Sequence, residues 1–125
     1  MKCNANCSCN SDDNVILFIE GTTVNLSFDF DEDISTYSEA KFVIRKNYNT
    51  APIITKTISI TEAFKLEIKL EKTETALANE YENGKNSATY IWGLDLLDND
   101  TNEQIPVFPQ AGEAAPLCIV DKHVV

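Results

Sequence analysis

The sequence lacks any long apolar run. Its longest uninterrupted apolar stretch covers residues 15–19, whereas about 20 consecutive apolar residues are needed to cross a bilayer. We therefore expect no transmembrane helix and no membrane partner. The first residues contain no apolar segment of the kind found in secretory signals, and no lipobox precedes an early cysteine. These features predict synthesis in a cytosol.

Basic residues are scarce. Ten Lys and Arg stand against 20 Asp and Glu among 125 residues, which gives a formal net charge of −10. No Lys or Arg occurs between Lys85 and Lys122. Proteins that bind nucleic acids obtain much of their affinity from Lys and Arg that displace counterions from phosphates. The composition therefore excludes nucleic acid as an expected partner and favours solubility.

Residues and motifs typical of catalytic sites are also scarce. The single histidine, His123, lies next to the C-terminus of the sequence, where chains usually fray. No nucleophile elbow, paired-histidine zinc motif or phosphate-binding glycine loop occurs. The carboxylates fall at predicted strand exteriors and turns, where pKa shifts are small. We therefore predict that the protein is not an enzyme.

What the sequence does contain is a series of strand patterns. Residues 24–31 and 64–70 alternate strictly between apolar and polar side chains, which is typical of strands with one buried face. Turn-forming residues separate these from further short apolar runs. About two turns of helix are expected within residues 71–82. The further predicted strands cover residues 15–19, 41–45, 53–60, 89–97, 105–108 and 117–124.

This pattern predicts an all-β protein, a single antiparallel β-sandwich of about seven to eight strands. Residues 1–14 are polar and form a cysteine-containing N-terminal arm, and residues 15–125 form the sandwich domain. One core between two sheets is expected. Its predicted members are Leu26, Phe28, Phe30, Phe42, Ile44, Leu66, Ile68, Trp92 and Leu94.

Two segments carry large apolar residues on both faces. In residues 90–97 the simplest explanation is a central strand covered on both sides, with Trp92 in the core. The alternative is that Trp92 or Tyr90 is a stacking platform for a sugar. Residues 117–124 are apolar on both faces too, so that strand lies between layers or contacts another protein. The residues predicted for such an interface are Leu117, Ile119, Val120 and Val124.

Four cysteines leave three interpretations open. Cys3, Cys7 and Cys9 lie close together in the arm, and Cys118 lies in the last predicted strand. Four thiolates suit a tetrahedral structural zinc ion, so these residues are a candidate metal-ligand set. A disulfide framework is the second interpretation. In the third, the arm carries thiols that are free or become oxidised later, Cys118 is an ordinary buried residue, and no cofactor is bound.

The order of segments resembles a known family. Gly21-Thr22-Thr23 leads into an alternating strand, followed by residues 40–45 (AKFVIR), 64–68 (FKLEI) and 90–95 (YIWGLD). In this order they resemble the immunoglobulin-like domain of tailed-bacteriophage structural proteins, such as the N-terminal sandwich of baseplate upper proteins and related tail or head-fibre proteins. The resemblance spans about residues 15–121 and implies an immunoglobulin-like sandwich.

The resemblance also implies a role in the virion. Because the sequence ends at Val125, we expect a stand-alone accessory or decoration module on the phage head or tail. Its implied partners are capsid, tail or fibre subunits, and it would be oligomeric or lattice-bound. It would be made in the host cytoplasm and located in the virion. The alternative function is a carbohydrate-binding module that uses aromatic stacking.

Overall fold

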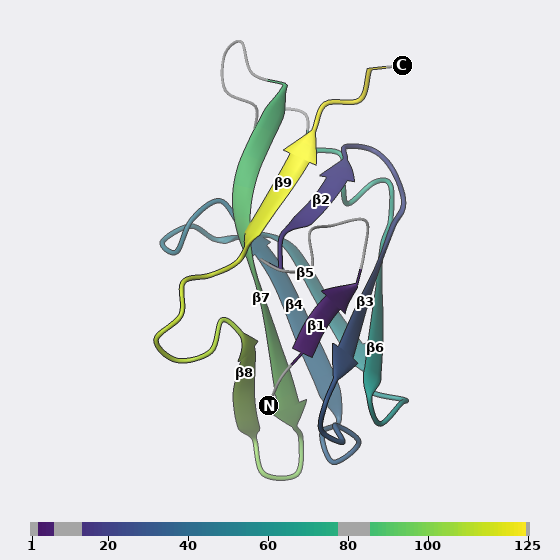
Figure 1. The fold of residues 1–125 in the computed structure, drawn as a ribbon, viewed down its shortest axis with the longest axis vertical. Coiled ribbons are helices and arrows are strands. Elements are labelled where there is room, and N and C mark those ends of the chain that lie inside the picture. Colours follow the sequence, from purple (N-terminus) through teal and green to yellow (C-terminus); the bar gives the residue numbers. More distant parts are fainter. Residues whose placement is uncertain (1–2, 7–13, 78–85, 125) are drawn as a thin grey trace.

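A computed structural model describes the backbone of residues 3–6 and all atoms of residues 14–77 and 86–124. Within these ranges the chain is all β, with nine strands in two sheets and no helix (Figure 1). None of the described residues belongs to a helix long and apolar enough to cross a membrane. The strands are β1 (Cys3–Asn6), β2 (Ile16–Ile19), β3 (Val24–Phe30), β4 (Glu39–Arg45), β5 (Pro52–Ser59), β6 (Lys65–Leu70), β7 (Ser87–Asp98), β8 (Glu103–Phe108) and β9 (Leu117–Asp121).

The two sheets differ in size. The smaller sheet has the order β1-β3-β6 and is antiparallel throughout. The larger sheet has the order β2-β9-β7-β4-β5, and β8 also pairs with β7. Its strands are antiparallel except for β2, which runs parallel to β9. The long strand β7 pairs with β9 through its first half and with β8 through its second half.

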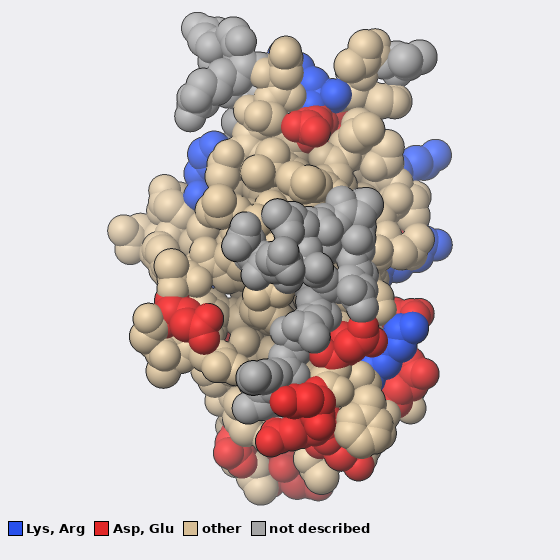
Figure 2. All heavy atoms as spheres, viewed as in Figure 1, with Lys and Arg blue, Asp and Glu red and all other residues tan. Residues whose placement is uncertain are grey.

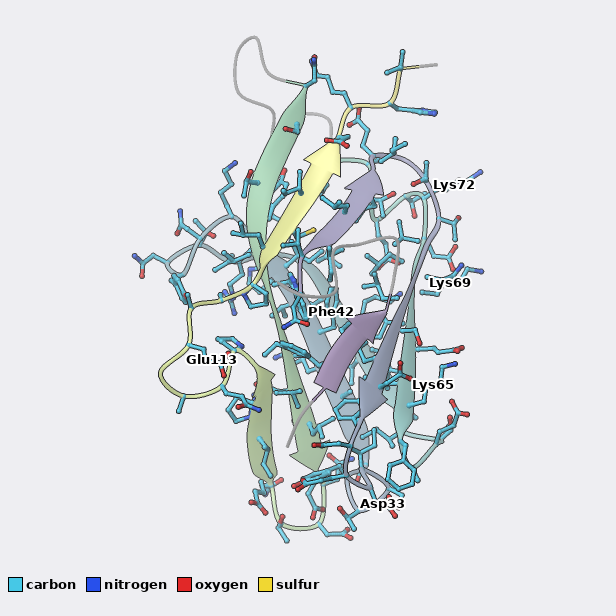
Figure 3. All side chains as sticks on the ribbon, viewed as in Figure 1. Asp33, Phe42, Lys65, Lys69, Lys72 and Glu113 are labelled. Carbon is cyan, nitrogen blue, oxygen red and sulfur yellow. The ribbon has the colours of Figure 1, made fainter. Side chains whose placement is uncertain are left out.

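The core lies between the two sheets and confirms the predicted one. All nine residues predicted for it are buried in one cluster. Its centre is aromatic, with Phe42 pointing into the space between the sheets (Figure 3). The ring centroids of Trp92 and Phe108 are 4.8 Å apart, and those of Trp92 and Phe28 are 5.7 Å apart. The prediction that β3 and β6 each bury one face is confirmed, because every second side chain of these strands enters the core.

The eight predicted strands are all present, and the predicted arm contributes one more. Residues Cys3–Asn6 form β1, which pairs along β3 with Cys3 opposite Phe30 and Asn6 opposite Ser27. At the other end of the chain, β9 stops at Asp121. It lies between β2 and β7, so it is an interior strand of the larger sheet.

The helix predicted within residues 71–82 is wrong for its described part. Residues 71–77 form one turn, in which the Thr75 amide donates to the Glu71 carbonyl at 3.1 Å; residues 78–82 lie outside the described ranges. Thr75 is fully buried, and its hydroxyl donates to the Thr22 carbonyl at 2.7 Å. The Gly21 amide donates to the Thr75 carbonyl at 3.2 Å. The Thr75 carbonyl thus accepts from the β2–β3 turn, whereas in a longer helix it would accept from the amide four residues later.

Candidate functional site

The outer face of the larger sheet carries an apolar strip over β2 and β9. The alternating burial of these strands sends Ile16, Phe18, Cys118 and Val120 into the core and their neighbours outward. Leu17 lies directly opposite Ile119 in the parallel register. We call the four outward apolar residues the β2–β9 strip: Leu17, Ile19, Leu117 and Ile119.

The strip retains only part of the predicted interface. Leu117 is 42% exposed and Ile119 is half-buried, so both remain available to a partner. Val120 is fully buried, and its assignment to an interface is wrong because it points into the core. Val124 is 93% exposed but lies beyond the end of β9. The structure adds Ile19, which is 46% exposed and is not among the residues predicted for the interface.

A hollow of about 240 Å³ lies on the same outer face, over β4 and β7. At its centre β7 changes partner, pairing with β9 up to Ile91 and with β8 from Leu94. A Cβ atom at Gly93 would lie 3.1 Å from the Phe108 carbonyl oxygen, so glycine permits the close approach of the β8 backbone. The floor consists of three cross-strand pairs: Lys41 with Asp95, Val43 with Gly93, and Arg45 with Ile91.

Two loops wall the hollow and are tied together. Tyr48, in the hairpin between β4 and β5, accepts a hydrogen bond from the Ala115 amide at 2.7 Å. The Arg45 guanidinium donates to the Thr50 carbonyl at 2.7 Å, which holds the same hairpin. Ala115 belongs to the loop between β8 and β9, which stands away from the body at the left of Figure 3, where Glu113 is labelled. The rim is therefore fixed by named contacts rather than by packing alone.

The charges in the hollow are mixed. Lys41 and Arg45 supply positive charge from β4, and Asp95 supplies one carboxylate from β7. The Gln104 side-chain amide donates a hydrogen bond to Asp95. Neither Lys41 nor Arg45 forms an ion pair within 4.0 Å with any residue the structure describes. The hollow therefore offers cationic donors beside a carboxylate that is already hydrogen-bonded.

Acidic side chains gather at the lower end of the face shown in Figure 2. Burial raises the pKa of Tyr37, and Glu103, Asp98 and Glu32 raise it further through their negative charge. Glu32 and Tyr37 lie between β3 and β4, Asp98 ends β7, and Glu103 begins β8. The negative charge of this end would repel an anionic partner.

Neither aromatic ring suggested as a sugar platform is accessible. Trp92 is 2% exposed and Tyr90 is fully buried. Stacking of a sugar on either ring is therefore ruled out, and the core interpretation of Trp92 is confirmed. The indole nitrogen of Trp92 donates to the Asn14 carbonyl at 3.1 Å, which satisfies its polar group inside the core.

The candidate metal ligands are only partly described. Cys7 and Cys9 lie outside the described ranges, and Cys3 lies in β1 of the smaller sheet. Cys118 is free, fully buried and in the larger sheet. No three metal-ligating side chains gather within the described residues. Burial raises the pKa of the Cys118 thiol to about 12, whereas a zinc ligand must be a thiolate. Its surroundings suit a small core residue.

We expect Cys118 to resist alkylation in the folded protein. In a variant with Cys3, Cys7 and Cys9 replaced by serine, iodoacetamide should react on the order of 1,000-fold more slowly at pH 8 without urea than in urea. The folded pKa lies above the unfolded one, so stability should be full below about pH 9 and fall as pH rises toward 12. Equal labelling rates in the two conditions would contradict the burial of this thiol.

No model of a protein family matches the chain, and no curated protein matches it significantly. The features that bear on function are therefore the β2–β9 strip and the hollow.

Proposed function

We propose that this protein is a non-enzymatic structural component of a tailed-phage virion, built as an immunoglobulin-like sandwich. The strand order supports this topology. Immunoglobulin domains keep their second and fifth strands in one sheet and their third, sixth and seventh in the other. Here β3 and β6 take the places of the second and fifth strands, and they share the smaller sheet. β4, β7 and β9 take the places of the third, sixth and seventh, and they share the larger sheet. β5 lies beside β4, as an additional strand does in variable-type domains.

The observation that carries the proposed role is the β2–β9 strip. On regular, paired strands it presents the exposed Ile19 and Leu117 together with the half-buried Leu17 and Ile119. Apolar patches on rigid elements mark contacts with other proteins. The proposed occupant is a capsid, tail or fibre subunit with an apolar, uncharged docking surface. Net charge of −10 keeps the unattached module soluble until it meets that subunit.

Incorporation into particles tests this role. We expect mass spectrometry of purified virions to detect the wild-type chain, and the double variant Ile19→Lys/Leu117→Lys to be lost from them. Placing two ammonium groups in an apolar contact should weaken attachment by roughly 100-fold or more. The matched control, Thr55→Lys/Thr57→Lys, puts the same charges on exposed positions of β5. It should assemble normally. Absence of the wild-type chain from every particle, or normal assembly of the strip variant, would refute the proposal.

A further inference from the structure

The hollow over β4 and β7 has features that attachment through the β2–β9 strip does not explain. Two cations without a described ion-pair partner line one cavity in a protein of net charge −10. Elsewhere in the described residues, Lys56, Lys65 and Lys69 do pair with glutamates. Figure 3 shows Lys65 and Lys69 pointing away from the core along β6. The cations of the hollow thus remain available for an anionic group from outside.

The volume of the hollow limits the size of the ligand that carries this anionic group. Ligand pockets for drug-sized molecules measure about 300–1,000 Å³, and this cavity is about 240 Å³. It therefore accommodates one ring or one small polar group rather than an extended ligand. Its floor at Val43 and Gly93 is apolar, and the Tyr48 ring stands at the rim, 65% exposed and held through its hydroxyl.

We propose that this hollow binds a single sugar ring that carries a carboxylate, such as a uronic acid unit of a polysaccharide. Lys41 and Arg45 pair with the ligand carboxylate through charge-assisted hydrogen bonds. Asp95 and Gln104 accept from and donate to ring hydroxyls, which need both functions. The Tyr48 ring contacts the apolar face of the sugar. The site is distinct from the buried rings of Trp92 and Tyr90 and does not depend on a virion role.

An acidic peptide fits the hollow less well than a carboxylated sugar, although it too could pair with Lys41 and Arg45. The carboxylate of Asp95 lies opposite Lys41 in the register and would repel a run of acidic side chains. The large negative charge of the whole protein would oppose such a peptide as well. A sugar ring brings one negative charge together with several hydroxyls, so it matches both the cations and the carboxylate of the hollow.

Titration of the ¹⁵N-labelled full chain with sodium glucuronate tests the site. We expect saturable shifts of the amides of Val43, Gly93 and Asp95 with a dissociation constant on the order of 1 mM, because a single sugar ring has few atoms. Glucose should bind at least about tenfold more weakly, since it lacks the carboxylate. Lys41→Gln and Arg45→Gln should each weaken glucuronate binding by about tenfold.

Matched variants and a second ligand keep the result interpretable. Lys72→Gln removes one charge in the turn after β6, away from the hollow (Figure 3), and should leave binding unchanged. Arg45→Gln also loses the bond to Thr50, so Lys41→Gln is the variant that decides. The proposal is overturned if about 20 mM glucuronate causes no shifts at these amides. It is equally overturned if glucose binds as tightly, if Lys41→Gln binds normally, or if a hexaglutamate peptide binds more tightly than glucuronate.

Discussion

Replacing Trp92 by alanine should lower the free energy of unfolding by about 3–5 kcal/mol. The side chain is 2% exposed and touches three aromatic rings, with centroids 4.8 Å away at Phe108, 5.7 Å at Phe28 and 5.8 Å at Phe42. Truncation leaves a cavity that both sheets line, so the site cannot collapse without moving strands. It also leaves the Asn14 carbonyl without the indole donor.

Urea denaturation followed by far-ultraviolet circular dichroism measures this loss, because Trp92 is the only tryptophan and its fluorescence disappears in the variant. Trp92→Phe is the matched control. It retains a ring but not the N–H donor, and should cost about 1–3 kcal/mol. An alanine variant as stable as the wild type would contradict the central position of this residue.

The fold followed from the sequence where one face of a strand is solvated. In β3 and β6 the alternation of apolar and polar residues predicted both the strand and the face that is buried. It also limits the register, because a slip by one residue would expose every core side chain. The same logic failed at residues 117–121. There, apolar residues occupy both faces, and periodicity cannot tell the core-facing Val120 from the outward Ile119.

The candidate sites were predictable only in part, for reasons of topology. The β2–β9 strip depends on parallel pairing between strands about 100 residues apart, which no local pattern encodes. The hollow lies where the strand paired with β7 changes from β9 to β8, and two separate loops form its walls. The one local signal was Gly93 inside an otherwise apolar strand. A glycine in such a position indicates close approach of another backbone.

Deletion of residues 117–125 should unfold the domain rather than expose a docking surface. This deletion removes β9, which pairs with β2 on one side and with β7 on the other. Among the described strands β2 has no other partner, so Ile16 and Phe18 would lose the cover that buries them. Cys118 and Val120, both fully buried, would leave the core as well. We expect the whole stability of the domain, about 5–15 kcal/mol for a chain of this kind, to be lost.

The measurement is a urea titration followed by circular dichroism, in which the truncated chain should show no cooperative transition. Deletion of residues 122–125 is the matched control, because these residues lie beyond β9. It removes the hydrogen bonds from the Lys122 amide to the Asn86 carbonyl and from the His123 amide to the Glu20 carboxylate, and should cost only about 1–2 kcal/mol. A cooperatively folded chain that ends at residue 116 would show that β9 is dispensable. Otherwise, failure of this truncation to enter virions reports on folding, and only substitutions within the β2–β9 strip can locate the attachment surface.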